Sequence, residues 1–241
     1  MQGLVWSALD AVLPRRCATC RRGISAGEIR ALCSACWDAI PRIDGPRCAV
    51  CGVPFSSEAA ISHSPTHRCG PCRNTPPAFT QAVAAGRYEG PLADAIRRCK
   101  YHRQVDLIVV LAELLNSVVD SLPPVDAVVP VPLHVRRLRH RQFNQSLRIA
   151  AEVARRLNRP LWPDALQRTR WTAPQTTLDR AHRQTNVRRA FTVRQPREVI
   201  GRRLLLVDDV YTTGATVNEC AKTLRAAKAS DVYVVTVARL P

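Results

Sequence analysis

The chain has 241 residues, a formal net charge of +17 and a hydrophobic fraction of 46%. This length suffices for one sizeable domain and a small one. No apolar run approaches the roughly 18 residues that a bilayer-spanning helix needs, which excludes helical membrane insertion. Residues 1–14 do not resemble a secretory signal, because they lack a basic start and Asp10 interrupts the apolar run. We therefore expect a cytoplasmic protein whose cysteines are reduced.

The positive charge is concentrated in the middle of the chain. Residues 134–203 contain 18 arginines and 4 acidic residues, a local balance of +14. A field of this sign favours polyanions such as pyrophosphate or nucleic acid. The alternative is a GC-rich genome that encodes arginine in place of lysine on a solvated face. It would explain 33 arginines against 3 lysines but not the shortage of acidic residues.

Four Cys-x-x-Cys knuckles occur within residues 15–75. Eight thiolates in four such pairs predict two tetrahedral zinc sites, because a two-residue gap turns both thiolates onto one metal. Sequential ligation is the simplest: one site would use Cys17, Cys20, Cys33 and Cys36, and the other Cys48, Cys51, Cys69 and Cys72. The spacing also allows a cross-braced pairing of the first knuckle with the third. A disulfide framework is the alternative that a reducing compartment disfavours.

The cysteine-rich piece predicts a structural module over residues 1–77, a double zinc ribbon with a short N-terminal helix. Four protein ligands leave no open position for water, so the metals would stabilise the fold and take no part in catalysis. His63 and His67 are interpreted as loop residues, because both ligand sets are already complete. Pro76-Pro77 is the predicted linker to a second domain over residues 78–241.

The second domain begins with alternating strand and helix signals, which predict an α/β fold with a parallel sheet. We expect a strand over residues 79–88, helices over 91–101 and 105–121, and a buried strand over 125–131. Lys100, near the end of the first of these helices, reads as a solvated helix-end cation. A last apolar strand is predicted over residues 232–237.

A basic loop follows the strand at 125–131, on the side of a parallel sheet where ligands bind. Its four arginines can neutralise a diphosphate-like or triphosphate-like group, and we predict a pyrophosphate loop made of Arg136, Arg137, Arg139, Arg141 and Asn144. Asn144 is also a plausible N-cap for the helix that extends to about residue 157. Residues 160–195 carry turn signals and no convincing helix. They predict a flap over the site, with Arg170 and Arg183 as its catalytic candidates.

Residues 204–216 contain the most informative motif, Leu-Leu-Leu-Val-Asp-Asp-Val-Tyr-Thr-Thr-Gly-Ala-Thr. A buried strand ends in Asp208 and Asp209, and small hydroxyl residues then lead into a helix. Hydroxyl groups and helix-start N–H groups suit a phosphate, whereas paired acids suit sugar hydroxyls or a hydrated Mg²⁺. An exposed turn is one alternative, and a nucleotide hydrolase is another that lacks its G-x-x-x-x-G-K-[ST] loop here. The pattern predicts a sugar phosphate ligand.

This motif resembles the phosphoribosyl pyrophosphate (PRPP) motif of type I phosphoribosyltransferases. The resemblance implies that Asp208 and Asp209 bind the ribose hydroxyls. It also implies that the 5′-phosphate is cradled by Thr212, Thr213, Gly214, Ala215 and Thr216. Purine-salvage members of that superfamily have an acid at the position of Thr212, so its absence argues against a hypoxanthine or guanine enzyme.

The combined motifs resemble the ComF family, in which zinc-binding cysteines precede a phosphoribosyltransferase-like domain. The resemblance covers almost the whole chain, from the knuckles through Lys100-Tyr101 and the Phe143-Asn144-Gln145 segment to the acidic pair. One departure is Gln142, where the family usually has glycine. The resemblance implies PRPP with Mg²⁺, two structural Zn²⁺ ions, and a role in DNA uptake or nucleotide metabolism.

The sequence is compatible with three functions. The first is a phosphoribosyltransferase whose acceptor is not identified by any sequence feature. The second is a single-stranded-DNA-binding competence factor, partnered with other DNA-uptake proteins, in which the PRPP pocket is regulatory. The third is an interaction protein whose pocket has lost catalysis.

Overall fold

The structure is a computed structural model that describes residues 16–24, 31–55, 66–101, 104–141, 143–171 and 187–240. The short helix expected near the N-terminus and the flap candidate Arg183 lie outside these residues. The cysteine-rich part contains two one-turn helices, α2 (Ser34–Asp38) and α3 (Gly70–Asn74). Each begins directly after the first cysteine of a knuckle and contains the second, so each helix turns two thiolates toward one point.

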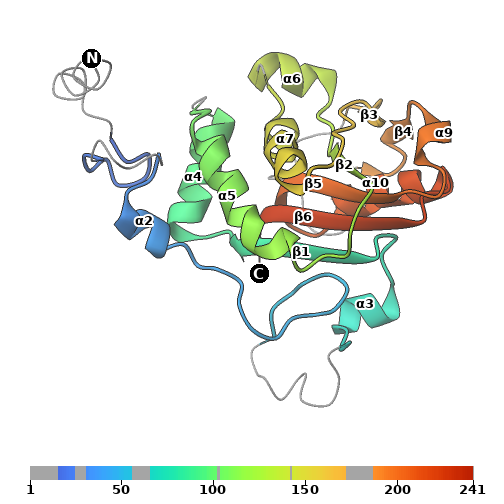
Figure 1. The fold of residues 1–241 in the computed structure, drawn as a ribbon, viewed down its shortest axis with the longest axis horizontal. Coiled ribbons are helices and arrows are strands. Elements are labelled where there is room, and N and C mark those ends of the chain that lie inside the picture. The colour runs from blue at the N-terminus through green and yellow to red at the C-terminus, as the bar shows by residue number, and fades with distance from the viewer. Residues whose placement is uncertain are drawn as a thin grey trace.

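Four parallel strands form the sheet of the larger domain, in the order β1-β6-β5-β2 (Figure 1). Their bounds are β1 (Gln81–Arg87), β2 (Ala127–Pro130), β5 (Arg203–Tyr211) and β6 (Asp231–Arg239). Because all four run the same way, their carboxyl ends lie at one edge of the sheet, where open α/β folds bind ligands. The predicted parallel α/β fold is confirmed.

Helices cover both faces of this sheet and define two cores (Figure 1). On one face, the buried residues of α4 (Gly90–Tyr101), α5 (Leu107–Val119) and α7 (Gln145–Leu157) pack with Leu205 and Val207 of β5. We name this cluster of buried residues the first core. On the other face, the buried residues of α10 (Ala215–Ala226) pack with Leu204 and Leu206, and we name this cluster the second core. Alternate residues of β5 thus lie on opposite faces of the sheet, as the two-residue period of a strand requires.

Two short strands and a one-turn helix lie between α7 and β5 in the chain. Strands β3 (Leu166–Arg168) and β4 (Phe191–Val193) form an antiparallel pair, and the one-turn helix α9 (Pro196–Val199) follows. The basic stretch that we expected as a loop contains a short helix, α6 (Val135–Arg141), so that expectation was wrong. Arginine and leucine are good helix formers, and this stretch has neither glycine nor proline. Within the part of the chain that the structure describes, every helix is too short or too polar to cross a membrane.

Candidate functional site

A cavity of about 570 Å³ lies at the carboxyl edge of the sheet. Its wall includes the ends of β5 and β2, the first turn of α7, the end of α4 and the β3 strand. The residues that matter chemically are Lys100, Arg136, Arg137, Ser146, Arg168, Trp171, Asp208, Asp209, Tyr211, Thr212, Gly214, Ala215 and Thr216. Segments far apart in the sequence therefore meet at the place that the acidic motif predicts.

Asp208 is held by the beginning of α7. Its Oδ1 atom accepts hydrogen bonds from the Ser146 hydroxyl at 2.8 Å and from the backbone N–H of Asp209 at 2.9 Å. Burial, and then the charge of Asp209, raise the pKa of the Asp208 carboxyl to about 7. Two acids that remain close in a buried cavity favour a ligand that donates hydrogen bonds or carries positive charge.

Asp209 forms an ion pair that we did not predict. The Lys100 Nζ atom lies 2.8 Å from Asp209 Oδ2, and their side chains are only 17% and 14% exposed. The expectation of a solvated helix-end cation was therefore wrong. Lys100 lies in the last turn of α4, whose Leu92 lies against Gly86 near the end of β1. Only the tertiary fold places this turn beside the acidic pair.

Residues 212–216 form the turn that leads into α10. Gly214 is the N-cap of that helix in a left-handed conformation, with φ of 75°. The Thr213 hydroxyl accepts from the Ala215 N–H at 3.4 Å, while Thr212, Gly214, Ala215 and Thr216 line the cavity. Helix-start N–H groups have no partner within their own helix, so they favour an anion at this position. We name residues 212–216 the anion loop.

The predicted pyrophosphate loop is divided by the fold. Arg136 and Arg137 line the cavity, whereas Arg139 is exposed and lies outside its wall. The side chain of Arg141 lies outside the described part. Asn144 caps α7, as expected: its Oδ1 accepts from the Ser146 N–H at 3.1 Å, and its amide donates to the Val131 carbonyl at 3.2 Å. Asn144 therefore supports the site from behind the cavity wall.

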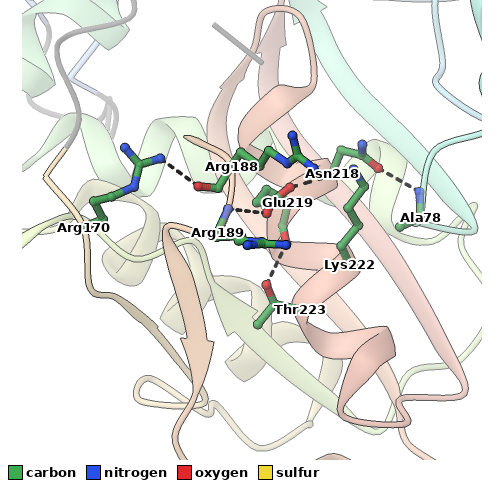
Figure 2. A network of polar contacts seen from close by, with 8 residues as sticks. All are labelled: Ala78, Arg170, Arg188, Arg189, Asn218, Glu219, Lys222 and Thr223. Carbon is green, nitrogen blue, oxygen red and sulfur yellow. Dashed lines mark hydrogen bonds and ion pairs between the residues drawn. The ribbon is translucent and has the colours of Figure 1, made fainter. Parts of the chain in front are cut away.

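Arg170 also lies away from the cavity wall. Its Nη2 atom donates to the Arg188 carbonyl at 2.7 Å, and the neighbouring Arg189 N–H donates to Glu219 Oε1 at 2.6 Å. Figure 2 shows this network, which joins both sides of the undescribed segment 172–186 to α10. Where Arg170 would act on a ligand therefore stays a prediction.

One cavity residue, Arg168, has a role that sequence reasoning did not assign. Arg168 is 7% exposed, and its guanidinium lies 5.3 Å from the centre of the Phe191 ring. Burial, and then the charge of Arg137, lower its pKa to about 10. The one available signal is the two-residue period of β3, which places Leu166 and Arg168 on the same buried face. An arginine held in this position favours an anionic ligand.

Trp171 extends the cationic wall with an aromatic surface. The indole ring lies 5.3 Å from His134 and 5.7 and 5.6 Å from the guanidinium carbons of Arg136 and Arg137. Burial, followed by the charges of nearby arginines, lowers the pKa of His134. This part of the wall can therefore attract phosphates and stack against a planar group.

The eight knuckle cysteines form two separate clusters. The first contains Cys17, Cys20, Cys33 and Cys36, and the second Cys48, Cys51, Cys69 and Cys72; within each, the sulfur atoms lie within 4.8 Å of one another. Tetrahedral zinc with bonds of about 2.3 Å separates sulfur atoms by about 3.8 Å, so both clusters fit a structural Zn²⁺. The sequential pairing is the one observed. His67 instead packs edgewise on Phe55, with ring centres 5.2 Å apart.

Two known protein families match separate segments of the chain. A double zinc ribbon domain matches residues 8–73, and a phosphoribosyl transferase domain matches residues 144–241. The DNA utilization protein YhgH of Escherichia coli (strain K12) is 36% identical over 228 residues, covering 92% of this chain and 96% of that protein. Competence protein F of Haemophilus influenzae is 32% identical over 231 residues, covering 93% and 96%.

Similarity to solved structures is weaker. A glutamine PRPP amidotransferase from B. subtilis, complexed with ADP and GMP, has a TM-score of 0.39 and 22% identity over 55% of this chain and 27% of that chain. That score is too low to support a functional argument. The two full-length relatives, together with the paired cysteine clusters and the parallel sheet, place this chain in the ComF family, to which competence protein F and YhgH belong.

Proposed function

We propose that the cavity binds PRPP together with Mg²⁺, and that the protein transfers or senses the 5-phosphoribosyl group. The observation that carries this proposal is the convergence of an acidic pair, an anion loop and three arginines on one cavity. A sugar with a phosphate at one end and a pyrophosphate at the other has the complementary distribution of hydroxyl groups and negative charge.

Each part of the ligand has a matching part of the cavity. Asp208 and Asp209 would accept hydrogen bonds from the ribose 2′- and 3′-hydroxyls, and the anion loop would hold the 5′-phosphate. Arg136, Arg137 and Arg168 would surround the pyrophosphate. Carboxylate oxygens next to phosphate-binding groups are also suitable neighbours for hydrated Mg²⁺, which would neutralise charge on the pyrophosphate.

Transfer requires the bond between ribose C1 and the pyrophosphate oxygen to break as an acceptor approaches C1. The sugar becomes cation-like while pyrophosphate takes the bonding electrons. The contribution of the chain is therefore to fix the ribose and to stabilise the negative charge on the leaving group. Trp171, beside Arg136 and Arg137, offers the acceptor or a nucleobase a planar surface at the rim.

Calorimetric titration of Mg²⁺–PRPP into wild-type protein, Asp208→Asn and Asp209→Asn tests this proposal. We expect each variant to weaken binding by at least tenfold, because a carboxylate acceptor is lost from a mostly buried site. Asp164→Asn, whose side chain is 80% exposed, is the matched control. Equal affinity in all four proteins would overturn the proposal. A pyrophosphate-release screen of PRPP against candidate acceptors then separates transfer from sensing.

A second candidate function is single-stranded DNA binding, which the similarity to a DNA utilization protein and a competence protein favours, as does the Trp171–arginine surface. Stacking on Trp171 and phosphate contacts to Arg136 and Arg137 would provide sequence-independent affinity. The test is oligonucleotide binding at several salt concentrations, for which we expect affinity to fall steeply as salt rises. Binding without a salt slope, or undiminished by Trp171→Ala, would count against this function.

A further inference from the structure

The second cysteine cluster is linked to the anion loop through Arg239, the last residue of β6. Arg239 is 9% exposed, and its Nη1 atom donates to the carbonyl oxygen of Cys51 at 2.7 Å. Its Nη2 atom lies 3.9 Å from the Cys51 sulfur. A cluster of four thiolates around Zn²⁺ is net negative, so the Arg239 guanidinium is both a hydrogen-bond donor and a counterion to it.

The same guanidinium packs on Tyr211, with its carbon 4.3 Å from the ring centre. Tyr211 ends β5 beside Arg239 in the sheet register, is 7% exposed and lines the cavity. One guanidinium therefore contacts a metal ligand and a wall of the ligand cavity.

Tyr211 in turn sets the shape of the anion loop. A Cβ atom on Gly214 would lie 2.2 Å from the Tyr211 hydroxyl oxygen and 2.5 Å from its ring carbon Cζ. The ring thus occupies the space over the left-handed Gly214, at the start of α10. If the ring moved, the backbone that presents N–H groups to an anion would lose its support.

We propose that Arg239 is a positioning residue that couples metal occupancy of the second cluster to the geometry of the anion loop. Loss of the metal would release the Cys48–Cys51 knuckle, and with it Arg239, Tyr211 and Gly214 in turn. Such coupling is reciprocal, so an anionic ligand in the loop retains the metal by the same factor by which the metal strengthens ligand binding. The nature of the ligand rests on the proposed function, whereas the coupling itself does not.

A ligand-free experiment tests the coupling alone. Hydrogen–deuterium exchange of the peptide that contains residues 211–217 is compared in zinc-loaded, full-length wild type, Arg239→Met and Arg87→Met. Arg87 is the exposed register partner of Arg239 on β1 and serves as the matched control. We expect exchange to be roughly fivefold faster or more in Arg239→Met, in the range of known coupling between sites, and unchanged in Arg87→Met. Equal exchange in Arg239→Met and wild type, with both zincs retained, would falsify the proposal.

Two further variants keep the test decisive if Arg239→Met does not fold. Tyr211→Leu removes the ring but leaves the bond from Arg239 to Cys51, so we expect two zincs and a faster-exchanging loop. Arg239→Lys keeps the positive charge, but its single amino group cannot replace both guanidinium contacts to the carbonyl oxygen and the sulfur of Cys51. We therefore expect an intermediate exchange rate. Wild-type exchange in a folded Tyr211→Leu protein would contradict the proposed order of contacts and so overturn the coupling.

The reciprocal measurement uses thiol labelling, read separately for each cluster by mass spectrometry, during challenge with a chelator. We expect saturating ribose 5-phosphate or PRPP to slow labelling of Cys48 and Cys72 severalfold, and to leave Cys17 and Cys36 unaffected. Equal protection of both clusters would contradict the coupling. If neither sugar phosphate binds, the proposed function fails, and the exchange experiment still decides the coupling.

Discussion

The two cysteine clusters are locally alike but are attached to opposite faces of the sheet. Cys17, Cys33 and Cys36 pack in the first core with Leu32 and the helices α4 and α5. Cys48, Cys51 and Cys72 pack in the second core, which also contains Tyr211 and the first residue of α10. The same Cys-x-x-Cys chemistry therefore stabilises a helical layer in one case and supports the cavity wall in the other. The packing surface, and not the ligand set, distinguishes the two clusters.

The largest expected effect comes from removing one ligand from each cluster. Cys36→Ser and Cys72→Ser should each lower the zinc content from two ions to one, because structural zinc contributes about 10 kcal/mol or more to its local fold. Only Cys72→Ser should weaken PRPP binding by tenfold or more. Metal analysis and calorimetry measure both quantities. If Cys36→Ser weakened ligand binding as much, the distinction between the clusters would be wrong.

Truncation of Leu32 perturbs the first cluster without touching its cysteines. Leu32 is 1% exposed in the first core, so Leu32→Ala should lower the free energy of unfolding by about 2–5 kcal/mol. We expect urea denaturation to show this loss while PRPP affinity stays within twofold of wild type. A parallel fall in affinity would indicate that the first core also sets the cavity geometry.

Gly52 tests the docking of the second cluster. Its φ is 70°, and a Cβ atom there would lie 2.5 Å from the Ala82 carbonyl of β1, whereas Gly45 (φ 81°) has open space around it. Gly52→Ala should cost about 2–4 kcal/mol through backbone strain and overpacking, and Gly45→Ala about 1 kcal/mol through strain alone. Thermal denaturation compares the two. Faster zinc loss is expected only in Gly52→Ala.

The raised pKa of Asp208 predicts that its ionisation destabilises the ligand-free protein. An aspartate whose folded pKa lies near 7 loses stability as pH rises from its unfolded value near 4 through 7. Asp208→Asn stays neutral, so we expect it to be more stable than wild type by on the order of 1–3 kcal/mol at pH 8, and by less at pH 5. The gain should persist in the Cys36→Ser background and shrink in Cys72→Ser. Denaturation curves at both pH values measure it, and a gain independent of pH would contradict the prediction.

The smallest effect is expected at the surface of the first cluster. The Arg42 guanidinium lies 5.0 Å from the centre of the Trp37 ring, which extends from α2. Because Arg42 is exposed, Arg42→Ala should cost only about 0.5–1 kcal/mol. Thermal shift measurements should detect this loss with no change in zinc content. A larger loss, or loss of a zinc ion, would show that this contact holds the cluster.

Much of the fold follows from local patterns. The knuckle spacing predicts both metal sites, because two residues between cysteines suffice to turn two thiolates inward. The apolar run before Asp208 predicts a buried parallel strand, and its acidic end predicts a ligand edge. Helices α4 and α5 are also close to their expected bounds, since their apolar periodicity extends over several turns.

Other features could not be predicted, because they depend on contacts between distant segments. Lys100 has the sequence context of an exposed helix end, yet it pairs with Asp209. Four neighbouring arginines appear equivalent in the sequence, but α6 directs Arg136 and Arg137 toward the cavity and leaves Arg139 outside its wall. Arg136 and Arg137 lie in the first turn of α6, beside the cavity, and Arg139 lies about one turn further along this helix.

The chemical groups of this protein are evident from its sequence: two sets of four thiolates, an acidic pair at the end of a buried strand, and an arginine-rich middle. These properties depend on residue types and short spacings, so they can be recognised before the fold is known. Which of these groups act together depends on the fold. It placed Lys100 and Arg168 at the acidic edge, and it joined Cys51 to Tyr211 through Arg239, 188 residues away. Such pairings depend on sheet order and on which face each element covers, and no local pattern encodes them.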